Sequence, residues 1–364
     1  MSKSRFAGIT SRVLMLLAAG LQVMTYLSVL VNPSRIWIMT VFGLLFVPVS
    51  LLNAVLLVWA VKRLSKAFVI PFLALLPSVF FLGEYVQFPE GGRGPEVQGA
   101  SDGHRTVRLI SYNVGRFASS DAIPEWQDCS DSVAVFLRSC DADIICLQEV
   151  RSKDVESLKA FLSKKFRGYR AEYYMKVGKD GCFGNVTLSR FGARDKGVVS
   201  FEESANMALF TDYVIGGRNM RVYNCHLESY ALSLPTVVKS IGQRDREFIR
   251  RTEDRVKTSI ARRQQQVDKI LNDIGASPVE AFVCGDFNDN PMSYTYFKLS
   301  RGRSDSFVEA GSGFGATYSF AWPMLRIDYV LFPGRLHAVS HETLKVKYSD
   351  HYPVVADIVI PAGG

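Results

Sequence analysis

Asp286 and Asn288 are the two residues whose types and spacing point most directly to chemistry. They lie in the stretch FVCGDFNDNP (residues 282–291), where an apolar run typical of a buried strand leads into the turn signal Asn290-Pro291. Residues i and i+2 of an extended segment share a face, so the carboxylate and the amide project together. Such a pair at the end of a rigid strand is suited to bind a metal ion or a phosphate group.

Similar polar residues mark other apolar runs in the second part of the chain. A lone Asn, Glu or His at a strand end is most often a cap, a turn residue or a structural hydrogen-bonding group. Asp328 is harder to explain in this way, because a carboxylate inside an apolar strand is costly unless it is paired. The repetition favours one shared site. The residues are Asn113, Glu149, Asn185, His226, Asp286, Asn288, Asp328, Asp350 and His351.

The elements that must position these residues lie in residues 105–364. Strand-like apolar runs alternate there with polar, helix-prone stretches, and this pattern predicts an α/β domain. A stretch rich in Gly and Pro over residues 89–104 is typical of a linker. The net charge of the chain is +8, but residues 1–100 hold eight basic against three acidic residues, which leaves about +3 for the rest. This balance alone gives no support for nucleic-acid binding.

Six motifs occur in an order that resembles a known superfamily. They are SYN (111–113), LQEV (147–150), NCHL (224–227), GDFN (285–288), IDYV (327–330) and SDHYPV (349–354). Together they resemble the endonuclease/exonuclease/phosphatase superfamily, which has the deoxyribonuclease I-like fold. The resemblance implies a two-sheet α/β/β/α sandwich with a site at one edge of the strands. It also implies hydrolysis of a phosphate ester by an activated water with Mg²⁺ or Mn²⁺, which prefer oxygen ligands.

The resemblance further implies a role for each candidate residue around the metal ion and the attacking water. Glu149 is the expected principal metal ligand, with Asn113 and Asp350 completing the metal site. Asp286 is expected to orient or deprotonate the attacking water. Asn288 is expected to hold a phosphate oxygen and to fix the geometry around Asp286.

A second group is expected to act on the phosphate and the leaving group. His351 is expected to bind the phosphoryl oxygen, while Asp328 accepts its other N–H and stabilises the imidazolium. His226 resembles a second histidine that acts near the leaving group in the nucleases and sphingomyelinases. Pancreatic-type nucleases pair that histidine with a glutamate, whereas this chain has Asn185 near that position. Asn185 is therefore expected to contact the phosphate or His226 instead.

Three apolar segments precede the linker. Residues 13–31, 36–61 and 67–85 approach or exceed the length of a membrane-spanning helix and predict three transmembrane helices in a membrane domain over residues 1–88. The alternatives are buried helices of a soluble bundle or, for the first segment, a cleaved signal peptide. Three such segments in succession argue against both.

Basic residues predict the orientation of these helices. Three precede the first segment, and Lys62, Arg63 and Lys66 lie between the second and third. By the positive-inside rule, the amino terminus is cytoplasmic. Three spans then place the catalytic domain on the outer, periplasmic side of the plasma membrane, which in a bacterium is the inner membrane.

Two further segments of the predicted catalytic domain carry expectations. Residues 239–263 hold nine Lys or Arg against four Asp or Glu and are predicted to be helical. We expect a solvated helical face, and the alternative is a basic flap that faces an anionic substrate or headgroup layer. The glycine-rich stretch over residues 311–318 is expected to be a loop on the substrate side. The six cysteines include no C-x-x-C pair, so a zinc site is not expected.

The sequence therefore predicts a membrane-anchored, metal-dependent phosphoesterase that hydrolyses phosphodiester or phosphomonoester bonds. Its expected partners are the lipid bilayer and a phosphate-ester substrate, either a lipid headgroup or a nucleic acid. One alternative is an endonuclease or exonuclease that acts on DNA or RNA. The other is a catalytically inactive binding module, which is disfavoured because each expected catalytic position holds a competent residue.

Overall fold

The computed structural model describes residues 3–88, 104–117, 129–202, 204–230, 246–320 and 323–362. The chain divides into two compact units. One contains Met1–Tyr85, Ala231–Gln264 and Asn290–Lys298, and the other contains Val86–Tyr230, Gln265–Asp289 and Leu299–Gly364. The linker predicted over residues 89–104 lies outside the described residues except for its last residue.

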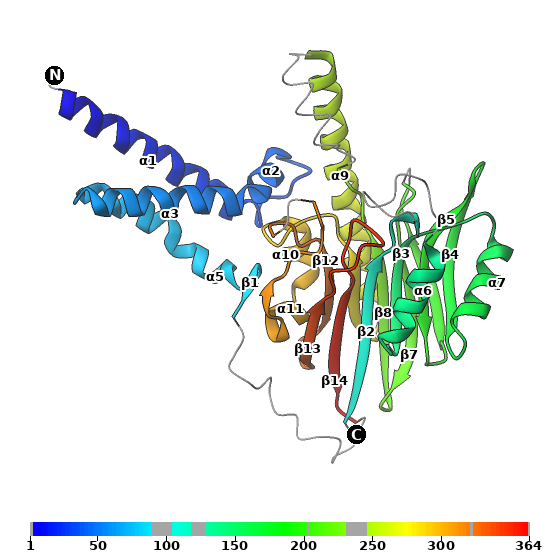
Figure 1. The fold of residues 1–364 in the computed structure, drawn as a ribbon. Coiled ribbons are helices and arrows are strands. Elements are labelled where there is room, and N and C mark those ends of the chain that lie inside the picture. Colours follow the sequence, from blue (N-terminus) through cyan, green and yellow to red (C-terminus); the bar gives the residue numbers. More distant parts are fainter. Residues whose placement is uncertain are drawn as a thin grey trace. The chain divides into compact units, whose positions relative to one another are not determined.

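The second unit is built around two six-stranded sheets (Figure 1). The first sheet has the order β10 (Arg303–Asp305), β12 (Asp328–Pro333), β9 (Glu280–Asp286), β8 (Arg218–His226), β7 (Met207–Ile215) and β6 (Asp195–Ser200). The second has the order β13 (His337–Thr343), β14 (Val354–Ile360), β2 (Arg105–Asn113), β3 (Ile144–Ser152), β5 (Gly181–Ser189) and β4 (Arg170–Gly178). Neighbouring strands are antiparallel except for the pairs β2–β3 and β8–β9. A two-stranded pair, β1 (Val86–Gln87) with β11 (Gly313–Phe314), lies outside these sheets.

The two sheets share one hydrophobic core. Leu109 and Cys146 of the second sheet belong to the same buried cluster as Val222, Cys284 and Val330 of the first. These runs are apolar along their length because both faces of the strands are covered, and burying each large aliphatic side chain contributes about 1.5–3 kcal/mol. The cysteines in these strands act as small apolar residues, and all six cysteines of the chain are free.

Helices cover the outer faces of the sheets. On the second sheet, α6 (Ser130–Ser139) and α7 (Val155–Lys165) bury apolar residues against β2, β3 and β5. The helices associated with the first sheet are α11 (Ser306–Ala310) and the carboxyl-terminal part of α9 (Arg246–Ala276). Val267 and Ile270 in this part of α9 are fully buried. The predicted α/β/β/α sandwich is therefore confirmed for this part of the chain.

The helix α9 contains the described part of the predicted basic segment, and residues 239–245 lie outside the described residues. Its exposed charges pair along the helix, with Arg251 on Glu247 and Lys257 on Glu253 at i,i+4 spacing. Pairs of this kind are typical of a solvated helical face.

The first unit contains the apolar amino-terminal helices. They are α1 (Lys3–Leu27), α2 (Ile38–Leu44), α3 (Phe46–Lys62), α4 (Val69–Leu75) and α5 (Val79–Leu82), with short 3₁₀ turns η1 (Lys66–Phe68) and η2 (Leu76–Ser78). Met15 and Ala18 of α1 pack on Leu56 and Ala60 of α3. Polar side chains also join these two helices, since Asn53 Nδ2 donates to the carbonyl oxygen of Ala18 at 3.0 Å.

The prediction of three continuous membrane-spanning helices is wrong for the described residues. Only Ile9–Leu27 is long and apolar enough by itself, and α2 and α3 together qualify only as a pair bent by 59°. Pro48 lies in the first turn of α3, where a missing N–H is tolerated, so a new helix starts there. The third segment, Lys66–Leu82, is shorter and contains the η2 turn with Pro77.

A short segment that follows the GDFN motif also belongs to the first unit. Ser28 Oγ donates to the carbonyl oxygen of Met292 at 2.7 Å, and Asn290 Nδ2 donates to the carbonyl oxygen of Gly43 at 3.0 Å. A Cβ on Gly43 would lie 2.2 Å from the Met292 carbonyl oxygen. Only glycine at position 43 therefore allows α2 to approach this segment so closely. The helix α10 (Tyr294–Ser300) follows, and Tyr296 donates to the Glu84 carboxylate.

Candidate active site

Strand register brings three of the predicted residues to one end of the first sheet. Asp286, the last residue of β9, pairs with His226 at the end of β8. On its other side, Asp286 pairs with Asp328 at the start of β12. The side chains of neighbouring strands in register lie on the same face, so these three polar groups are adjacent.

The second sheet supplies two more residues at its corresponding end. Asn113 ends β2 and pairs with Gln148 of β3, the residue before Glu149. His351 follows β13 in the segment that leads into β14 and forms an isolated bridge with Tyr318. Each sheet therefore contributes to the site through the ends of its central strands.

Unusual backbone conformations aim two of these side chains. Glu149 has φ 55° and Asn288 has φ 52°, in the left-handed region that residues other than glycine rarely occupy. The ladder between β3 and β5 is irregular over Leu147–Val150, and this bulge redirects Glu149. Gly285 has φ 133°, and a Cβ there would lie 1.9 Å from the carbonyl oxygen of Cys225. Strain of this kind persists where the surrounding structure determines it, as at functional sites.

Asp286 is buried at the centre of the site. Its Oδ2 accepts hydrogen bonds from Asn113 Nδ2 at 2.9 Å and Asn288 Nδ2 at 3.1 Å, and its Oδ1 accepts one from the Asn288 backbone at 2.8 Å. The Nε2 atoms of His226 and His351 lie 3.9 and 3.8 Å from the same Oδ2. Burial raises the pKa of Asp286 to about 6, although the charge of His351 opposes this. A carboxylate with a pKa near neutrality is suited to accept a proton.

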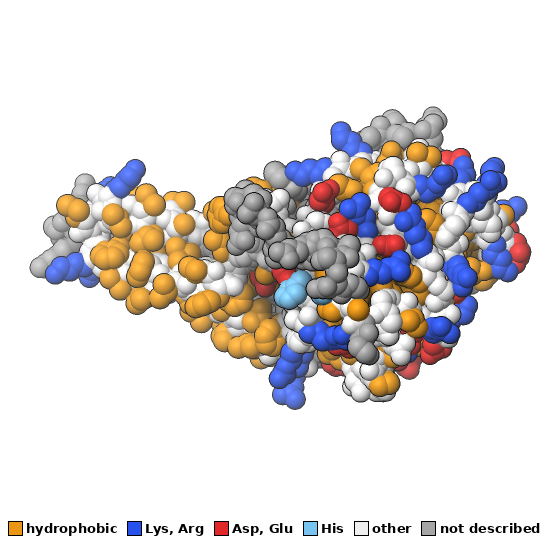
Figure 2. Space-filling model, turned by 90° about the horizontal axis from the view of Figure 1, so that it is seen from below, with side chains coloured by type: hydrophobic (Ala, Val, Ile, Leu, Met, Phe, Trp, Pro, Cys, Tyr) orange, Lys and Arg blue, Asp and Glu red, His pale blue; other side chains and the backbone are white. Residues whose placement is uncertain are grey.

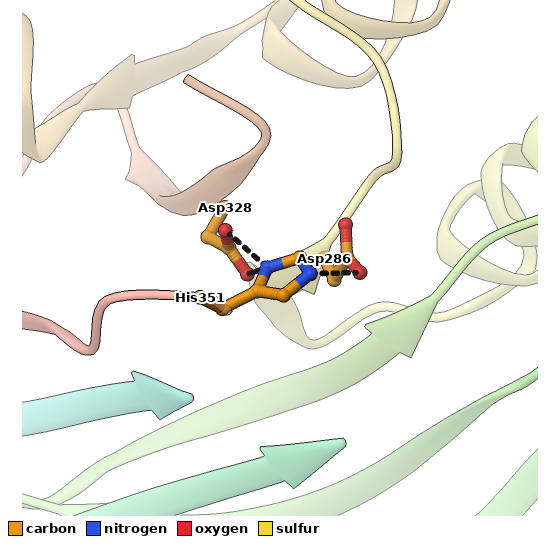
Figure 3. A group of neighbouring side chains, drawn as sticks. All are labelled: Asp286, Asp328 and His351. Carbon is orange, nitrogen blue, oxygen red and sulfur yellow. Dashed lines mark hydrogen bonds and ion pairs between the residues drawn. The ribbon is translucent and has the colours of Figure 1, made fainter. Parts of the chain in front are cut away.

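The imidazole of His351 lies between two carboxylates, Asp328 beside Nδ1 and Asp286 beside Nε2 (Figure 3). The Nδ1–Asp328 Oδ2 distance is 2.9 Å. Burial by itself would lower the pKa of His351, but the charges of Asp328 and Asp286 outweigh it and raise the pKa to about 10. The ring is therefore an imidazolium at neutral pH, and Asp328 fixes its orientation. Such a cation is suited to donate to a phosphate oxygen as negative charge develops.

Glu149 is the most accessible carboxylate of the central group, with a side-chain exposure of 24%. Its Oε1 accepts from Asn113 Nδ2 at 3.3 Å and lies 3.4 Å from His226 Nε2, and its Oε2 lies 3.6 Å from Arg116 Nε. Burial would raise the pKa of Glu149, but His226, Asn113, His351 and Arg116 together lower it. Glu149 is thus an ionised carboxylate that reaches the open side of the site.

The comparison with protein families agrees with this geometry. Residues 110–351 match the model of the Endonuclease/Exonuclease/phosphatase family. The chain belongs to this family. Residues 9–85 match a second model, described as a domain of unknown function (DUF8431). No curated protein matches the chain.

Solved structures of family members share the fold. An endonuclease/exonuclease/phosphatase from Beutenbergia cavernae has 18% identity and a TM-score of 0.54, over 71% of this chain and 72% of its own. One from Bacteroides vulgatus has 20% identity and a TM-score of 0.52, over 70% and 98%. A mannosyl-6-phosphatase from Bacteroides thetaiotaomicron has 18% identity and a TM-score of 0.51, over 70% and 100%. These likenesses show that the second unit shares the fold of these proteins.

Endonuclease/exonuclease/phosphatase family members generally use a divalent metal ion. The side chains that could act as ligands indicate where such an ion would fit. Among the described residues, Asp286, Asp328 and His351 have ligand atoms within 4.8 Å of one another. An imidazolium cannot bind a cation, because both of its nitrogens carry protons. Glu149 fits better, since it is ionised and accessible, and hard divalent ions prefer carboxylate oxygens. Asp350, which is partly exposed, is the other accessible carboxylate beside His351.

Three predicted amide residues use their nitrogen atoms to hold other groups. Asn113 Oδ1 accepts from the Gly115 backbone at 3.0 Å, which turns its nitrogen toward the carboxylates instead of offering an oxygen to a metal ion. Asn288 Nδ2 donates to the Leu227 carbonyl at 2.9 Å as well as to Asp286. Asn185 Nδ2 donates to the backbone carbonyls of Asn224 at 3.0 Å and Met207 at 3.4 Å. In this arrangement neither Asn288 nor Asn185 has a side-chain donor left for a phosphate.

His226 differs from the paired histidine of the pancreatic-type nucleases. Its Nε2 faces Glu149 and Asp286, and its Nδ1 is buried and has no hydrogen-bond partner among the described residues. Asn185 is committed elsewhere and does not supply one. His226 therefore lies next to the reacting groups without the carboxylate that would fix its tautomer.

Sequence reasoning did not identify Tyr318 and Arg116, which also line the site. The Tyr318 ring packs edge-on against His351 with centroids 5.1 Å apart. Burial and the Asp350 carboxylate, with which Tyr318 forms a hydrogen bond, raise the pKa of Tyr318 to about 12. The glycine-rich stretch over residues 311–318 predicted a loop here but not which residue would point into the site. The sequence around Arg116 contains no motif that would mark this arginine, which follows β2, as a site residue.

Proposed function

We propose that this chain is a membrane-attached, metal-dependent phosphoesterase that hydrolyses a phosphodiester or phosphomonoester with an activated water. The observation that carries the proposal is the position of His351 between Asp328 and Asp286, with the accessible carboxylate of Glu149 beside the neighbouring His226. A purely structural role would not require a buried imidazolium together with left-handed backbone conformations at Glu149 in one sheet and Asn288 after a strand of the other. The family match supports the reaction class.

The chain's own residues can activate the water and hold the phosphate in this hydrolysis. Asp286 accepts the proton of the attacking water, and Asn113 and Asn288 hold its carboxylate in place through hydrogen bonds. His351 donates from Nε2 to a phosphoryl oxygen, and Asp328 stabilises its charge from the other side. Tyr318 packs on the ring and restricts it. A divalent ion, Mg²⁺ or Mn²⁺, held by Glu149 with Asp350, would neutralise charge on the reacting phosphate.

The substrate class follows from charge and location. Residues after position 100 carry a surplus of only about +3, which is small for a protein that binds a nucleic-acid backbone. Membrane attachment would tether the catalytic unit to a bilayer, which presents phosphorylated headgroups. A phosphorylated headgroup or small phosphate ester therefore fits better than DNA or RNA. A nuclease stays the second candidate, because the family includes nucleases.

A substrate panel tests this proposal. The full chain, purified in detergent with Mg²⁺, is incubated with plasmid DNA, RNA, phospholipids, sphingomyelin, inositol phosphates and a sugar 6-phosphate. We expect phosphate-ester cleavage in the headgroup or small-molecule arms. Cleavage confined to DNA or RNA would assign the protein to the nucleases, and no cleavage by folded protein in any arm would favour a binding module.

Membrane attachment is proposed from the surface of the amino-terminal helices. Leu17 is 63% exposed, Val55 66% and Phe80 85%. Hydrophobic side chains cover this part of the molecule, whereas charged side chains are spread over the other unit (Figure 2). An exposed apolar surface of this extent is typical of a membrane or interaction site.

We expect the full chain to stay with membranes after alkaline carbonate extraction. Leu17→Lys together with Val55→Lys should release part of it, because a lysine at the bilayer centre costs about 2.5–3.5 kcal/mol. Ser163→Lys serves as the control, because it adds the same charge at an exposed position of α7 in the second unit. Complete release of the wild-type chain would contradict membrane attachment.

The side of the membrane depends on how many of the apolar segments cross. The basic residues Lys3, Arg5 and Arg12 in the first half of α1 favour a cytoplasmic amino terminus, and a single crossing by Ile9–Leu27 would then place the catalytic unit outside. A reporter enzyme fused at Gly364 and active only outside the cytoplasm measures this directly. Activity only of a cytoplasmic reporter would contradict an outer location.

A further inference from the structure

A basic pocket lies beside the candidate active site in the second unit. It has a volume of about 480 Å³ and is formed mainly by the hairpin that joins β4 and β5. Four basic side chains line it, together with Asp180 and several apolar groups. The basic residues are Arg116, Arg151, Lys176 and Lys179. No catalytic role described above uses the last three.

The local structure holds these charges on one concave surface. Arg151 at the end of β3 donates from Nη2 to the Asp180 carbonyl oxygen at 3.1 Å and so reaches across to the hairpin turn. Lys176 on β4 donates to the backbone carbonyl oxygen of Ser204. Gly181 has φ 116°, and a Cβ there would lie 2.5 Å from the Ser152 carbonyl, so the hairpin packs tightly on β3. Asp180 is the only acidic residue of the lining, which leaves the pocket strongly positive.

Two residues are shared between this pocket and the catalytic centre. Arg116 Nε lies 3.6 Å from Glu149 Oε2, and the Arg116 guanidinium lies 5.8 Å from the centroid of the Phe183 ring. Phe183 in turn lies 6.3 Å from the His226 ring, centroid to centroid. Arg116 and Phe183 therefore connect the lining of the pocket with the surroundings of Glu149 and His226.

We propose that this pocket binds a second phosphate group of the substrate, so that the enzyme prefers esters with two separate phosphates. Positive side chains in a concave surface favour a multiply charged anion, and arginine matches phosphate oxygens with two N–H donors. The apolar face of Phe183 suits the carbon skeleton between the two phosphates. This inference deepens the proposed function and rests on it for the position of the reacting phosphate.

A small bisphosphate fits the pocket better than a nucleic-acid strand does. A nucleic acid presents a row of phosphates and requires a stripe of basic groups along its backbone. The pocket is instead one local concentration of charge on the β4–β5 hairpin. The preferred substrate would thus be a small or headgroup compound with phosphates on two positions of a short carbon frame.

Binding measurements without turnover test this directly. The full chain with Asp286→Asn, which removes the proposed base, is titrated in detergent and Mg²⁺ with D-fructose 1,6-bisphosphate and with D-fructose 6-phosphate. We expect the bisphosphate to bind at least about tenfold more tightly. Arg151→Gln combined with Lys179→Glu should remove this preference and leave the affinity for the monophosphate unchanged. Lys179→Glu alone, at an exposed turn residue, should reduce the preference in part and guards against misfolding of the double variant.

Lys164→Glu is the matched control, since Lys164 is an exposed lysine of α7 outside the pocket lining. It should leave both affinities unchanged. Equal affinities for the two probes, or a preference that survives in the double variant, would overturn the proposal. A ten-nucleotide deoxythymidine strand that binds more tightly than the bisphosphate and is weakened by the same substitutions would also overturn it. These binding results do not depend on hydrolysis, so they separate failure of this inference from failure of the proposed activity.

Discussion

Replacing Asp286 by Asn is expected to lower kcat for phosphate-ester hydrolysis by about 10²–10⁴-fold. The substitution keeps the size of the side chain and removes its ability to accept a proton. Two asparagine amides donate hydrogen bonds to Oδ2 of this buried carboxylate and two imidazoles lie nearby, and burial raises its pKa to about 6, which is suited to a base at neutral pH. Steady-state rates on the best ester of the substrate panel measure the effect.

The matched control for this prediction is Asp289→Asn, three residues further along the chain. Asp289 is also a buried carboxylate, and its Oδ1 accepts from Tyr230 at 3.0 Å, a bond that asparagine can still accept. Its kcat should stay near the wild-type value, with circular dichroism spectra that match for all three proteins. Similar rates for Asp286→Asn and the wild type would remove Asp286 from the mechanism.

Replacing Glu149 by Gln is expected to weaken binding of the divalent ion by at least about a hundredfold and to lower activity in parallel at limiting metal. Removing a group that only orients a metal ligand already costs about 10–100-fold in affinity, so loss of the charged ligand should cost at least as much. Glu149 is the accessible ionised carboxylate of the site. Isothermal titration calorimetry of the metal-free protein with Mn²⁺ measures the affinity.

Glu156→Gln provides the comparison for this second prediction. Glu156 is an exposed residue at the start of α7 that pairs only at the surface with Lys159, and such pairs contribute little. Its metal affinity and activity should equal those of the wild type. If Glu149→Gln also keeps the wild-type affinity for Mn²⁺, the metal site lies elsewhere.

Much of the sandwich could be predicted from the sequence because its strands are buried on both faces. Continuous apolar runs before Asn113, Glu149, His226 and Asp286 marked four central strands, and each ends within a few residues of its polar group. The polar residue at the end of each run then predicted a site at the strand ends. The register that places Asp328 opposite Asp286 comes from pairing between distant segments, which no local signal encodes.

The parts that could not be predicted depend on backbone direction and tertiary contact. The left-handed conformation of Glu149 arises from a bulge that is visible only once β3 and β5 are paired. The amide groups of Asn113 and Asn185 could have pointed either way, and their backbone partners decide it. Tyr318 enters the site because its loop bridges to His351.

The amino-terminal helices show the limit of composition as a guide. Charge-free stretches predicted three spans, but composition does not locate the bend at Leu45 or the turn at Pro77. It also gave no sign that Ser28 and Gly43 would contact residues 290–292, immediately after the GDFN motif. That contact requires a residue without a side chain at position 43. In the sequence, nothing distinguishes Gly43 from the other glycines.

The most direct test of the central claim is the rate at which the full chain releases p-nitrophenol from bis(p-nitrophenyl) phosphate, with and without a chelator. A metal-dependent phosphoesterase with Asp286 as its base should turn over this diester in Mg²⁺ or Mn²⁺. It should stop when EDTA is added and recover when the ion is restored, and Asp286→Asn should stay at least about a hundredfold slower than the wild type in the presence of the ion. Turnover that is equally fast in EDTA, or equally fast in the Asp286→Asn variant, would contradict the mechanism.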